Sequence, residues 1–273
     1  MAQFTQRLQK SSTPTAKRVV DINTDYGQSR DKDVFQQPDM KLLDNVSSVN
    51  IPCCVHDGDP LDILEKIQNA KSRNIGVGAH IAYPDPQQGG YEEISMPTEE
   101  LKAWIYVQLG IFQALSKASG LDIEHVRPHG ALYRKFLTDP ETARAVAEAV
   151  YTINPWLFLI GPTGPILTDI QESVGIRTVS EVYLGKRYSP EGTLIPEKLH
   201  ETLPPQGILD QAKQLVNEGV ITSEDGKSTP ITFSTLHLSP HIKGCSPLSE
   251  RLVEIVGKPQ PIAIEAVTVS GWV

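Results

Sequence analysis

The chain has 273 residues, 39% of them hydrophobic and 21% charged, a balance typical of a soluble protein with a sizeable core. A formal net charge of −8 argues against a general nucleic-acid binder, and no apolar run approaches the length of a membrane span. Two of the three cysteines, Cys53 and Cys54, are adjacent, so no disulfide framework is expected. A reducing compartment, the cytoplasm, fits this cysteine usage best.

The segment 1–18 carries four basic side chains and no acidic one, a composition that fits either a transit peptide or a flexible tail. Pro14 interrupts any helix there and no apolar face forms, which favours the tail. We therefore expect a flexible tail over 1–17. We expect one β/α barrel domain over 18–273, because no linker-like stretch divides that part of the chain.

After the tail, short apolar stretches alternate with amphipathic segments. The expected strands are 18–23, 48–51, 75–80, 125–128, 157–160, 178–183, 232–237 and a closing strand 262–269. Asp-Pro pairs at 59–60 and 139–140 start two of the intervening helices, and the clearest helix covers 98–118. About seven strand–helix repeats imply a parallel sheet, and so many in one chain favour a closed barrel over an open sheet.

Polar residues gather where the predicted strands end. Alternation places Asp21, Asn23 and Asp25 on one face of the first strand, beside apolar Val20 and Ile22. Such a face suits a binding site better than a packed core, and the alternative is a turn rich in Asp and Asn.

Five of the seven histidines also follow predicted strands: His56, His80, His129, His237 and His241. Any one of them alone would suit a structural role under a loop. In a barrel, however, the loops after the strands meet at one face, where active sites lie. Imidazole groups there can bind a metal or move a proton.

Several stretches resemble motifs of the LamB/YcsF family, which includes lactam utilization proteins and the A subunit of 5-oxoprolinase. Residues 21–27 (DINTDYG) resemble its D-x-N-x-D-x-G start, and residues 127–133 (RPHGALY) resemble K-P-H-G-A-L-Y. Residues 48–60 are similar to S-A-N-I-A-C-G-F-H-A-G-D-P, and residues 78–85 to G-A-H-P-x-Y-P-D. Residues 180–192 are similar to S-E-V-F followed by R-x-Y-x-x-x-G. The match covers roughly residues 18–237 in order and is specific as a set.

The resemblance implies a seven-stranded, TIM-like (β/α)7 barrel related to those of glycoside hydrolases and polysaccharide deacetylases, enzymes of carbohydrate metabolism. It also implies a lactam substrate, since family members with two partner subunits open 5-oxoproline to glutamate using ATP. This chain carries no G-x-x-x-x-G-K-[ST] phosphate loop. Any ATP step would therefore belong to partner subunits, and a homo-oligomer is equally compatible with the sequence.

These expectations assign roles to particular residues. Asp25 and Asp21 are candidates for general base, and His129 and His56 for acid or oxyanion partner. If a divalent metal binds, the expected ligands are Asp25, His80 and His129, as in the related deacetylase barrels. The expected substrate-binding residues are Asn23, Asn50, Asp59, His80, Asp85, Tyr133, Glu181, Arg187 and His237.

The chain departs from the family pattern at several positions. This chain has Gln28 where the family has Glu, and Cys54 where it has Gly. It has Leu238-Ser239 where the family has G-D, and Tyr91-Glu92-Glu93 where it has G-R-R. Loss of two arginines predicts that 5-oxoproline is a poor substrate and that a larger neutral lactam binds better. The alternative is that residues 86–96 form a solvated lid that never touches the ligand.

Taken together, the motifs lead us to expect a lactam or cyclic-amide hydrolase. The alternatives are a non-hydrolytic cyclase, lyase or epimerase, and a catalytically silent binding protein.

Overall fold

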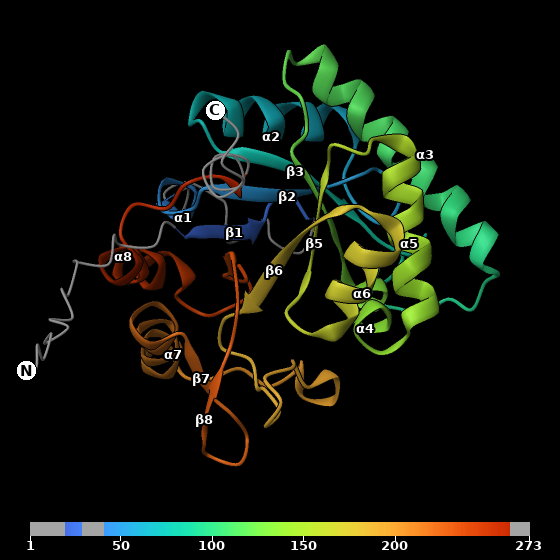
Figure 1. Cartoon of the computed structure of the whole chain (residues 1–273). Helices are drawn as coiled ribbons and strands as arrows, with labels where there is room; N and C mark the ends of the chain where they lie inside the picture. The colour runs from blue at the N-terminus through green and yellow to red at the C-terminus, as the bar shows by residue number, and fades with distance from the viewer. Residues whose placement is uncertain (1–19, 29–40, 263–273) are drawn as a thin grey trace, which may run out of the picture.

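The computed structural model describes residues 20–28 and 41–262. Within them, seven parallel strands close into a barrel in the order β1-β2-β3-β4-β5-β6-β9 (Figure 1). The strands are β1 (Asp21–Asp25), β2 (Ser48–Pro52), β3 (Gly76–Ile81), β4 (His125–Pro128), β5 (Phe158–Pro162), β6 (Arg177–Tyr183) and β9 (Thr235–His237). The expected (β/α)7-type barrel is confirmed. The expected closing strand 262–269, apart from its first residue, and the expected tail over 1–17 lie outside the described residues.

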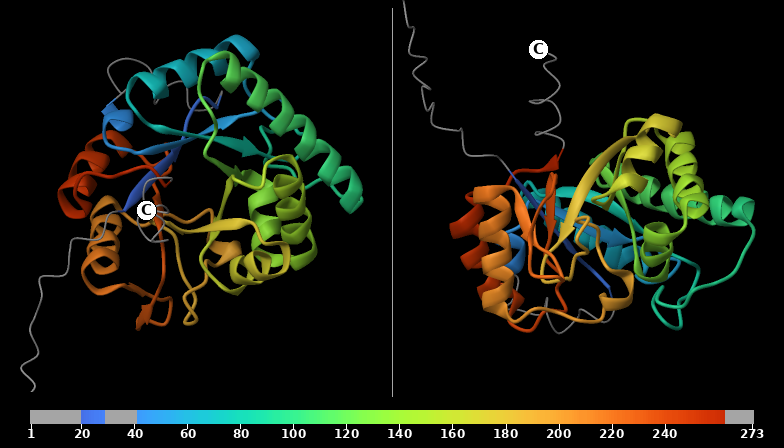
Figure 2. Two further views of the ribbon diagram at one scale, coloured as in Figure 1. Left: turned by 45° about the horizontal axis from the view of Figure 1, so that its top comes forward. Right: turned by 60° about the horizontal axis from the view of Figure 1, so that its bottom comes forward.

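Helices surround the strands, as the left view of Figure 2 shows. They are α1 (Lys41–Asp44), α2 (Pro60–Ser72), α3 (Thr98–Ala118), α4 (Gly130–Thr138), α5 (Pro140–Ile153), α6 (Pro165–Val174), α7 (Pro205–Glu218) and α8 (Cys245–Val256), with the 3-10 turn η2 (Pro196–Lys198). No helix among the described residues is long and apolar enough to cross a membrane.

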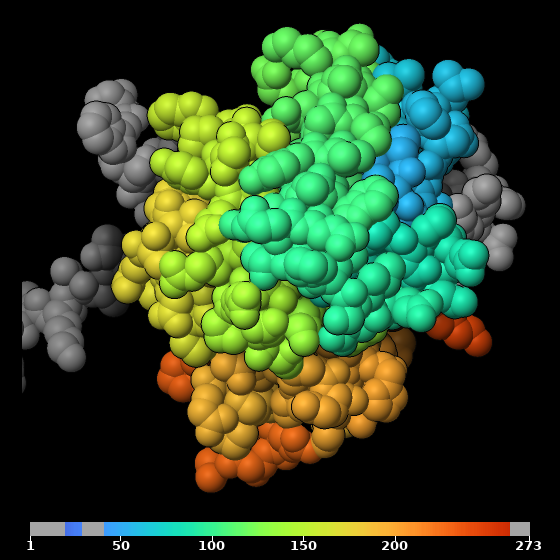
Figure 3. Space-filling model, turned by 90° about the vertical axis from the view of Figure 1, so that its right-hand side faces the viewer, coloured from blue at the N-terminus to red at the C-terminus, as the bar shows by residue number. Residues whose placement is uncertain are grey.

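Two local signals in the sequence explain where helices begin and which face they bury. Asp59 caps α2 by accepting hydrogen bonds from the backbone N–H groups of Leu61 and Asp62, and Asp139 caps α5 in the same way through Glu141. Helix α3 buries Leu101, Ile105, Leu109 and Phe112, spaced three or four residues apart. In Figure 3, α3 runs in green across the visible face beside the yellow-green residues of α5, against which it packs.

A helix after β4, the 3-10 turn η2 and a hairpin outside the barrel were not predicted from the sequence. Helix α4 begins at Gly130, directly after β4, where a tight turn was expected; Gly130 has a φ of +54°, which glycine adopts without the steric cost that a Cβ brings. Strands β7 (Val220–Thr222) and β8 (Ser228–Pro230) form an antiparallel hairpin outside the barrel. The predicted strand 232–237 shortens to Thr235–His237.

Strand register brings the polar residues of the barrel interior into adjacent layers. Asp25 pairs with Asn50 across β1 and β2, and Asn23 pairs with His237 across β1 and β9. Glu181 pairs with Thr235 across β6 and β9. Side chains that point inward from neighbouring strands therefore meet at the carboxyl end of the barrel.

Candidate active site

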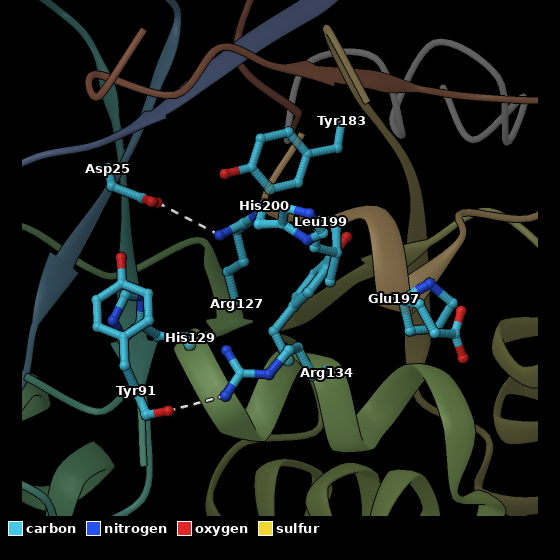
Figure 4. A pocket seen from close by; sticks show the side chains of 12 residues that line it. Asp25, Tyr91, Arg127, His129, Arg134, Tyr183, Glu197, Leu199 and His200 are labelled. Atoms are coloured by element: carbon cyan, nitrogen blue, oxygen red, sulfur yellow. Dashed lines mark hydrogen bonds and ion pairs between the residues drawn. The ribbon is translucent and has the colours of Figure 1, made fainter. Parts of the chain in front are cut away.

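A cavity of about 490 Å³ opens at the carboxyl ends of the strands (Figure 4). Asp25 ends β1, Arg127 lies near the end of β4, and Tyr183 ends β6; all three line the cavity. Further lining comes from Tyr91, from His129 and the first turns of α4, and from residues 196–200. The cavity therefore combines the carboxylates of Asp25 and Glu197 with guanidinium, imidazole and phenol groups at the face where barrel enzymes carry their sites.

Asp25 is the acidic group at the centre of this arrangement, and it is buried with 5% exposure. Its Oδ1 accepts a hydrogen bond from Asn50 Nδ2 at 3.0 Å and lies 3.4 Å from Arg127 Nη1. Burial alone would raise the pKa of Asp25, but His80 and His237, when they carry a second proton, and the Arg127 guanidinium outweigh it and hold that pKa well below its usual range. Asp25 is therefore a carboxylate at neutral pH.

Two buried histidines aim their Nε2 atoms at this carboxylate. His80 Nε2 lies 3.2 Å from Oδ1 of Asp25, and His237 Nε2 lies 3.6 Å from Oδ2. Their Nδ1 atoms lie 3.0 Å from the carbonyl oxygen of Arg127 and 2.7 Å from Oδ1 of Asn23, respectively. Both of those oxygens can only accept, so each Nδ1 carries its hydrogen. A neutral ring would then turn a lone pair toward Asp25, a contact that a proton or a metal cation between the two groups would make favourable.

Arg127 is one of the cavity-lining residues that sequence reasoning did not single out as site residues. Its Nε and Nη2 atoms donate to both carboxylate oxygens of Glu181 at 2.8 and 2.9 Å, and Tyr133 Oη donates to Glu181 Oε1 at 2.9 Å. Burial would lower the pKa of Arg127, but Glu181 and Asp25 raise it further above its usual value. Alternation along β4 puts His125 and Arg127 on one face, and this signal could have identified Arg127.

His129 is held by hydrogen bonds at both ring nitrogens. Its Nε2 lies 2.9 Å from the carbonyl oxygen of Gly89, and its Nδ1 lies 3.1 Å from Nε2 of Gln28. Because a carbonyl only accepts, Nε2 carries the hydrogen and Nδ1 accepts from the Gln28 amide. Burial, and then His80 and His56, hold the pKa of His129 well below its usual value, so the ring is neutral.

The imidazole ring of His56 packs against the rings of His129 and His80 and makes no hydrogen bond to the described residues. Its ring stacks on that of His129 with centroids 5.0 Å apart and meets the ring of His80 edge-on at 6.1 Å. Neither ring nitrogen has a hydrogen-bond partner among the described residues. Burial, and then His80, lower the pKa of His56 to about 3. An unpaired buried imidazole beside a cavity is a feature of sites that bind a ligand.

The structure brings together the three residues expected to hold a metal. Asp25, His80 and His129 each offer a ligand atom, and these atoms lie within 4.8 Å of one another. Carboxylate oxygen and neutral imidazole nitrogen are ligands that zinc and other divalent cations accept.

Asn23, Asn50, Tyr133, Glu181, His80 and His237 also gather at this centre. All six are buried, and of them only Tyr133 lines the cavity. Asn23 donates to Glu181 Oε2 at 3.2 Å, and Asn50 donates to Asn23 Oδ1 at 2.9 Å. Most of these predicted substrate-binding residues therefore lie one layer behind the cavity wall, where they hold Asp25 and Arg127 in place.

Besides His56, four other predicted site residues do not line the cavity. Asp59 is exposed and caps α2, and Arg187 is exposed with its Nε 3.7 Å from Glu201. Asp85 is buried, and its carboxylate accepts the backbone N–H groups of Gln88 and Glu92, which shapes the loop 85–92. Asp21 lies at the amino end of β1, where the hydroxyl groups of Ser47, Ser48 and Thr235 donate to it. Of the three polar residues on this face of the first strand, only Asp25 therefore reaches the open end of the barrel, and Asp21 lies at the opposite end.

The departures from the family pattern fall at different distances from the cavity. Glu92 and Glu93 are exposed and do not line it, and Glu93 lies 3.3 Å from Lys135. The geometry thus gives no support to the expected repulsion between these acids and a substrate. Gln28, by contrast, contacts His129 directly. Cys54 has a φ of +63°, a left-handed conformation that suits the glycine of the family pattern.

Barrel and cavity together define a (β/α)7-barrel protein whose site combines a buried carboxylate with a guanidinium group and neutral imidazoles. The chain belongs to the LamB/YcsF family, whose model matches residues 20–256.

Similar proteins carry consistent names. The 5-oxoprolinase A subunit of Histophilus somni is 34% identical over 223 residues, which cover 81% of this chain and 88% of that protein. The 5-oxoprolinase A subunit of Methylococcus capsulatus is 33% identical over 258 residues, covering 93% and 97%. Among solved structures, the lactam utilization protein of Thermus thermophilus superposes with a TM-score of 0.80 at 32% identity, covering 89% of this chain and 99% of that one.

Proposed function

We propose that this protein is an enzyme that acts on a lactam or related cyclic amide and breaks its ring C–N bond by acid–base catalysis at Asp25. Family membership and the names of the relatives support the substrate class. The observation that carries the proposal is the position of the Asp25 carboxyl group, which lines the cavity while two buried imidazoles and Arg127 surround it.

Hydrolysis of a lactam requires that a water molecule lose a proton as it attacks the carbonyl carbon and that the ring nitrogen gain one as it leaves. Asp25 is the acceptor for the first proton, since it is a carboxylate that reaches the cavity. Arg127, fixed by Glu181, lies beside it with guanidinium N–H groups that can donate to the carbonyl oxygen as charge develops there. Each such contribution is worth on the order of 10²–10⁴ in rate.

A divalent cation is a second way to complete the same centre. Asp25 and His80 fit this role, because the Nε2 atom of His80 already faces the carboxylate. His129 fits only if it gives up Gly89 or Gln28, which occupy both of its nitrogens. A bound cation would polarise the lactam carbonyl. We expect turnover to survive EDTA; loss of turnover that Zn²⁺ or Mn²⁺ restores would favour the metal centre.

Partner subunits are part of the proposal. The relatives are named as the A subunit of their enzyme, and this chain carries no phosphate loop of the G-x-x-x-x-G-K-[ST] kind. Any use of ATP is therefore assigned to partner subunits.

A non-hydrolytic reaction on a lactam-containing metabolite, such as cyclisation, elimination or epimerisation, is the second candidate. It is favoured by the two hydrogen bonds that occupy His129, which leave that ring with no free lone pair to activate water. This candidate keeps the substrate class and changes the bond that reacts.

A panel of lactams tests the proposal. The purified protein is incubated with each lactam, with and without ATP, partner subunits and EDTA, and products are separated by mass. A product heavier than its substrate by one water identifies hydrolysis, and an isomer or a product lighter than its substrate identifies the second candidate. Absence of any lactam conversion or lactam binding under all conditions would reject both.

A further inference from the structure

Two guanidinium groups line the cavity, and their surroundings differ. Arg127 is buried and bound to Glu181 and Asp25, so its charge is already compensated. Arg134, on α4, is half-buried, and no acid of the described residues lies within ion-pair distance of it. Among the described residues, its guanidinium group makes one hydrogen bond, from Nη2 to the carbonyl oxygen of Tyr91 at 2.8 Å. Arg134 therefore offers the cavity an uncompensated positive charge.

Arg134 is also held in position. Three successive carbonyl oxygens, those of Gly89, Gly90 and Tyr91, accept hydrogen bonds from His129, from the backbone N–H of Ala131 and from Arg134. Segment 89–91 is thereby fastened to the end of β4 and the first turns of α4. Figure 4 shows the guanidinium of Arg134 beside Tyr91, with Arg127 and Asp25 beyond it. A guanidinium fixed in this way loses little side-chain freedom when it binds an anion.

We infer that Arg134 recognises a carboxylate carried by the lactam substrate while the lactam ring lies against Asp25 and Arg127. This inference rests on the proposed function and names its substrate class more narrowly. The carboxylate is assigned to the Arg134 side because Glu197, in the other charged part of the wall, is acidic. A carboxylate-bearing lactam replaces the neutral lactam that the sequence led us to expect. That expectation depended on Glu92 and Glu93, which do not line the cavity.

The size of the cavity narrows the substrate further. About 490 Å³ is within the range of pockets that hold ligands larger than a single five-membered ring. Pro196, Glu197, Leu199 and His200 line another part of the cavity. The substrate class is therefore a lactam that bears a carboxylate and a further substituent.

Calorimetry with a matched pair of ligands tests the inference. The probes are 5-oxoproline, its carboxamide, and an N-substituted derivative of each. The proteins are the wild type, Arg134→Gln, Arg134→Lys and the control Arg144→Gln, which removes an equal charge from an exposed position on α5. The wild type should bind each carboxylate about tenfold or more tightly than its carboxamide. Arg134→Gln should abolish that preference without weakening carboxamide binding, Arg134→Lys should keep part of it, and the control should keep all of it.

The possible outcomes distinguish failure of the carboxylate site from failure of the proposed lactam function. Equal affinities for acid and amide in the wild type, with no effect of Arg134→Gln, would overturn the carboxylate site and leave the lactam function standing. Equal weakening of both ligands by Arg134→Gln would assign Arg134 to fastening segment 89–91, and would also overturn it. Displacement of bound lactam by inorganic phosphate but not by acetate would point to a phosphorylated ligand and reject the carboxylate. A wild type that binds neither probe would reject the lactam function itself.

Discussion

Hydrogen-bond direction at single residues determines what each imidazole of the site can do. His80 and His237 fix their hydrogens on Nδ1 and leave Nε2 facing Asp25, whereas His129 has both nitrogens engaged. The partner of His129 is Gln28, which replaces the Glu of the family pattern. An amide donates where a carboxylate only accepts, so this one substitution changes the tautomer that the ring adopts.

Replacing Gln28 by Glu should move the hydrogen of His129 from Nε2 to Nδ1. The Nε2 lone pair would then face the carbonyl oxygen of Gly89, and that hydrogen bond would be lost. Nitrogen NMR of ¹⁵N-histidine-labelled protein distinguishes the two neutral tautomers. A wild-type ring that already carries its hydrogen on Nδ1, or a variant that keeps it on Nε2, would contradict this assignment.

Asp21 should affect stability rather than turnover. Burial raises its pKa to about 6, from an ordinary value of 3.8, and it does not line the cavity. The stability it contributes is present below pH 3.8 and is lost as pH rises through 6, because the unfolded chain ionises first. Relative to the wild type, the unfolding free energy of Asp21→Asn should therefore rise by up to about 3 kcal/mol between about pH 4 and 6 and stay level above that. Denaturant titrations measure this difference, and a pH-independent difference with abolished turnover would instead support a catalytic Asp21.

The sequence predicted part of the site because strand alternation and strand ends are local features. Asp25, His80 and His129 were found in this way, and the structure brings them together. Arg127 was missed because its importance comes from Glu181, 54 residues later in the chain. Asp21 was placed beside Asp25 because alternation gives a face but not a depth along the barrel.

At the scale of single elements, helix α4 and segment 89–91 pack together and form one wall of the cavity. A Cβ at residue 130 would lie 2.2 Å from the carbonyl oxygen of Gly90, and the backbone there has a positive φ. The sequence signal for this helix was ambiguous, because the Pro128 and Gly130 that end β4 also suggest a turn. Helices with long apolar periodicity were predicted well, as α3 shows by matching 98–118.

Gly130→Ala should destabilise the protein by roughly 2–4 kcal/mol, since it combines a left-handed backbone with a clash against segment 89–91. Gly175→Ala is the matched control, because φ is +79° there and nothing lies within 4 Å of the added Cβ. That control should cost only about 1 kcal/mol. Urea unfolding of both variants measures the cost of the clash as the difference between their losses of unfolding free energy. Equal losses would show that segment 89–91 moves aside without cost.

At the scale of the whole molecule, repeated strand–helix units predicted the barrel correctly, because their short connections and right-handed crossovers leave few topologies. Strand register was not predictable, since it depends on contacts between distant segments such as Asn23 and His237. The hairpin β7–β8 was missed because its strands have three residues each and bury little apolar surface.

We predict that the chain unfolds as one domain. Its strands close a single ring, with no linker among the described residues to separate one half from the other. Thermal unfolding followed by far- and near-ultraviolet circular dichroism should give one coincident transition. Two separate transitions, or stable halves after limited proteolysis, would contradict this.

The central claim is that Asp25 carries out chemistry on a lactam, and its most direct test is turnover by Asp25→Asn. The substitution keeps the size of the side chain and removes its charge, and Asp59→Asn is the control because asparagine caps a helix as well as aspartate does. Conversion of a carboxylate-bearing lactam, with partner subunits and ATP present, is followed by ¹³C NMR of the ring carbonyl. The account predicts a rate loss of about 10² or more for Asp25→Asn and an unchanged rate for Asp59→Asn. A wild-type rate in the folded Asp25→Asn variant would contradict it.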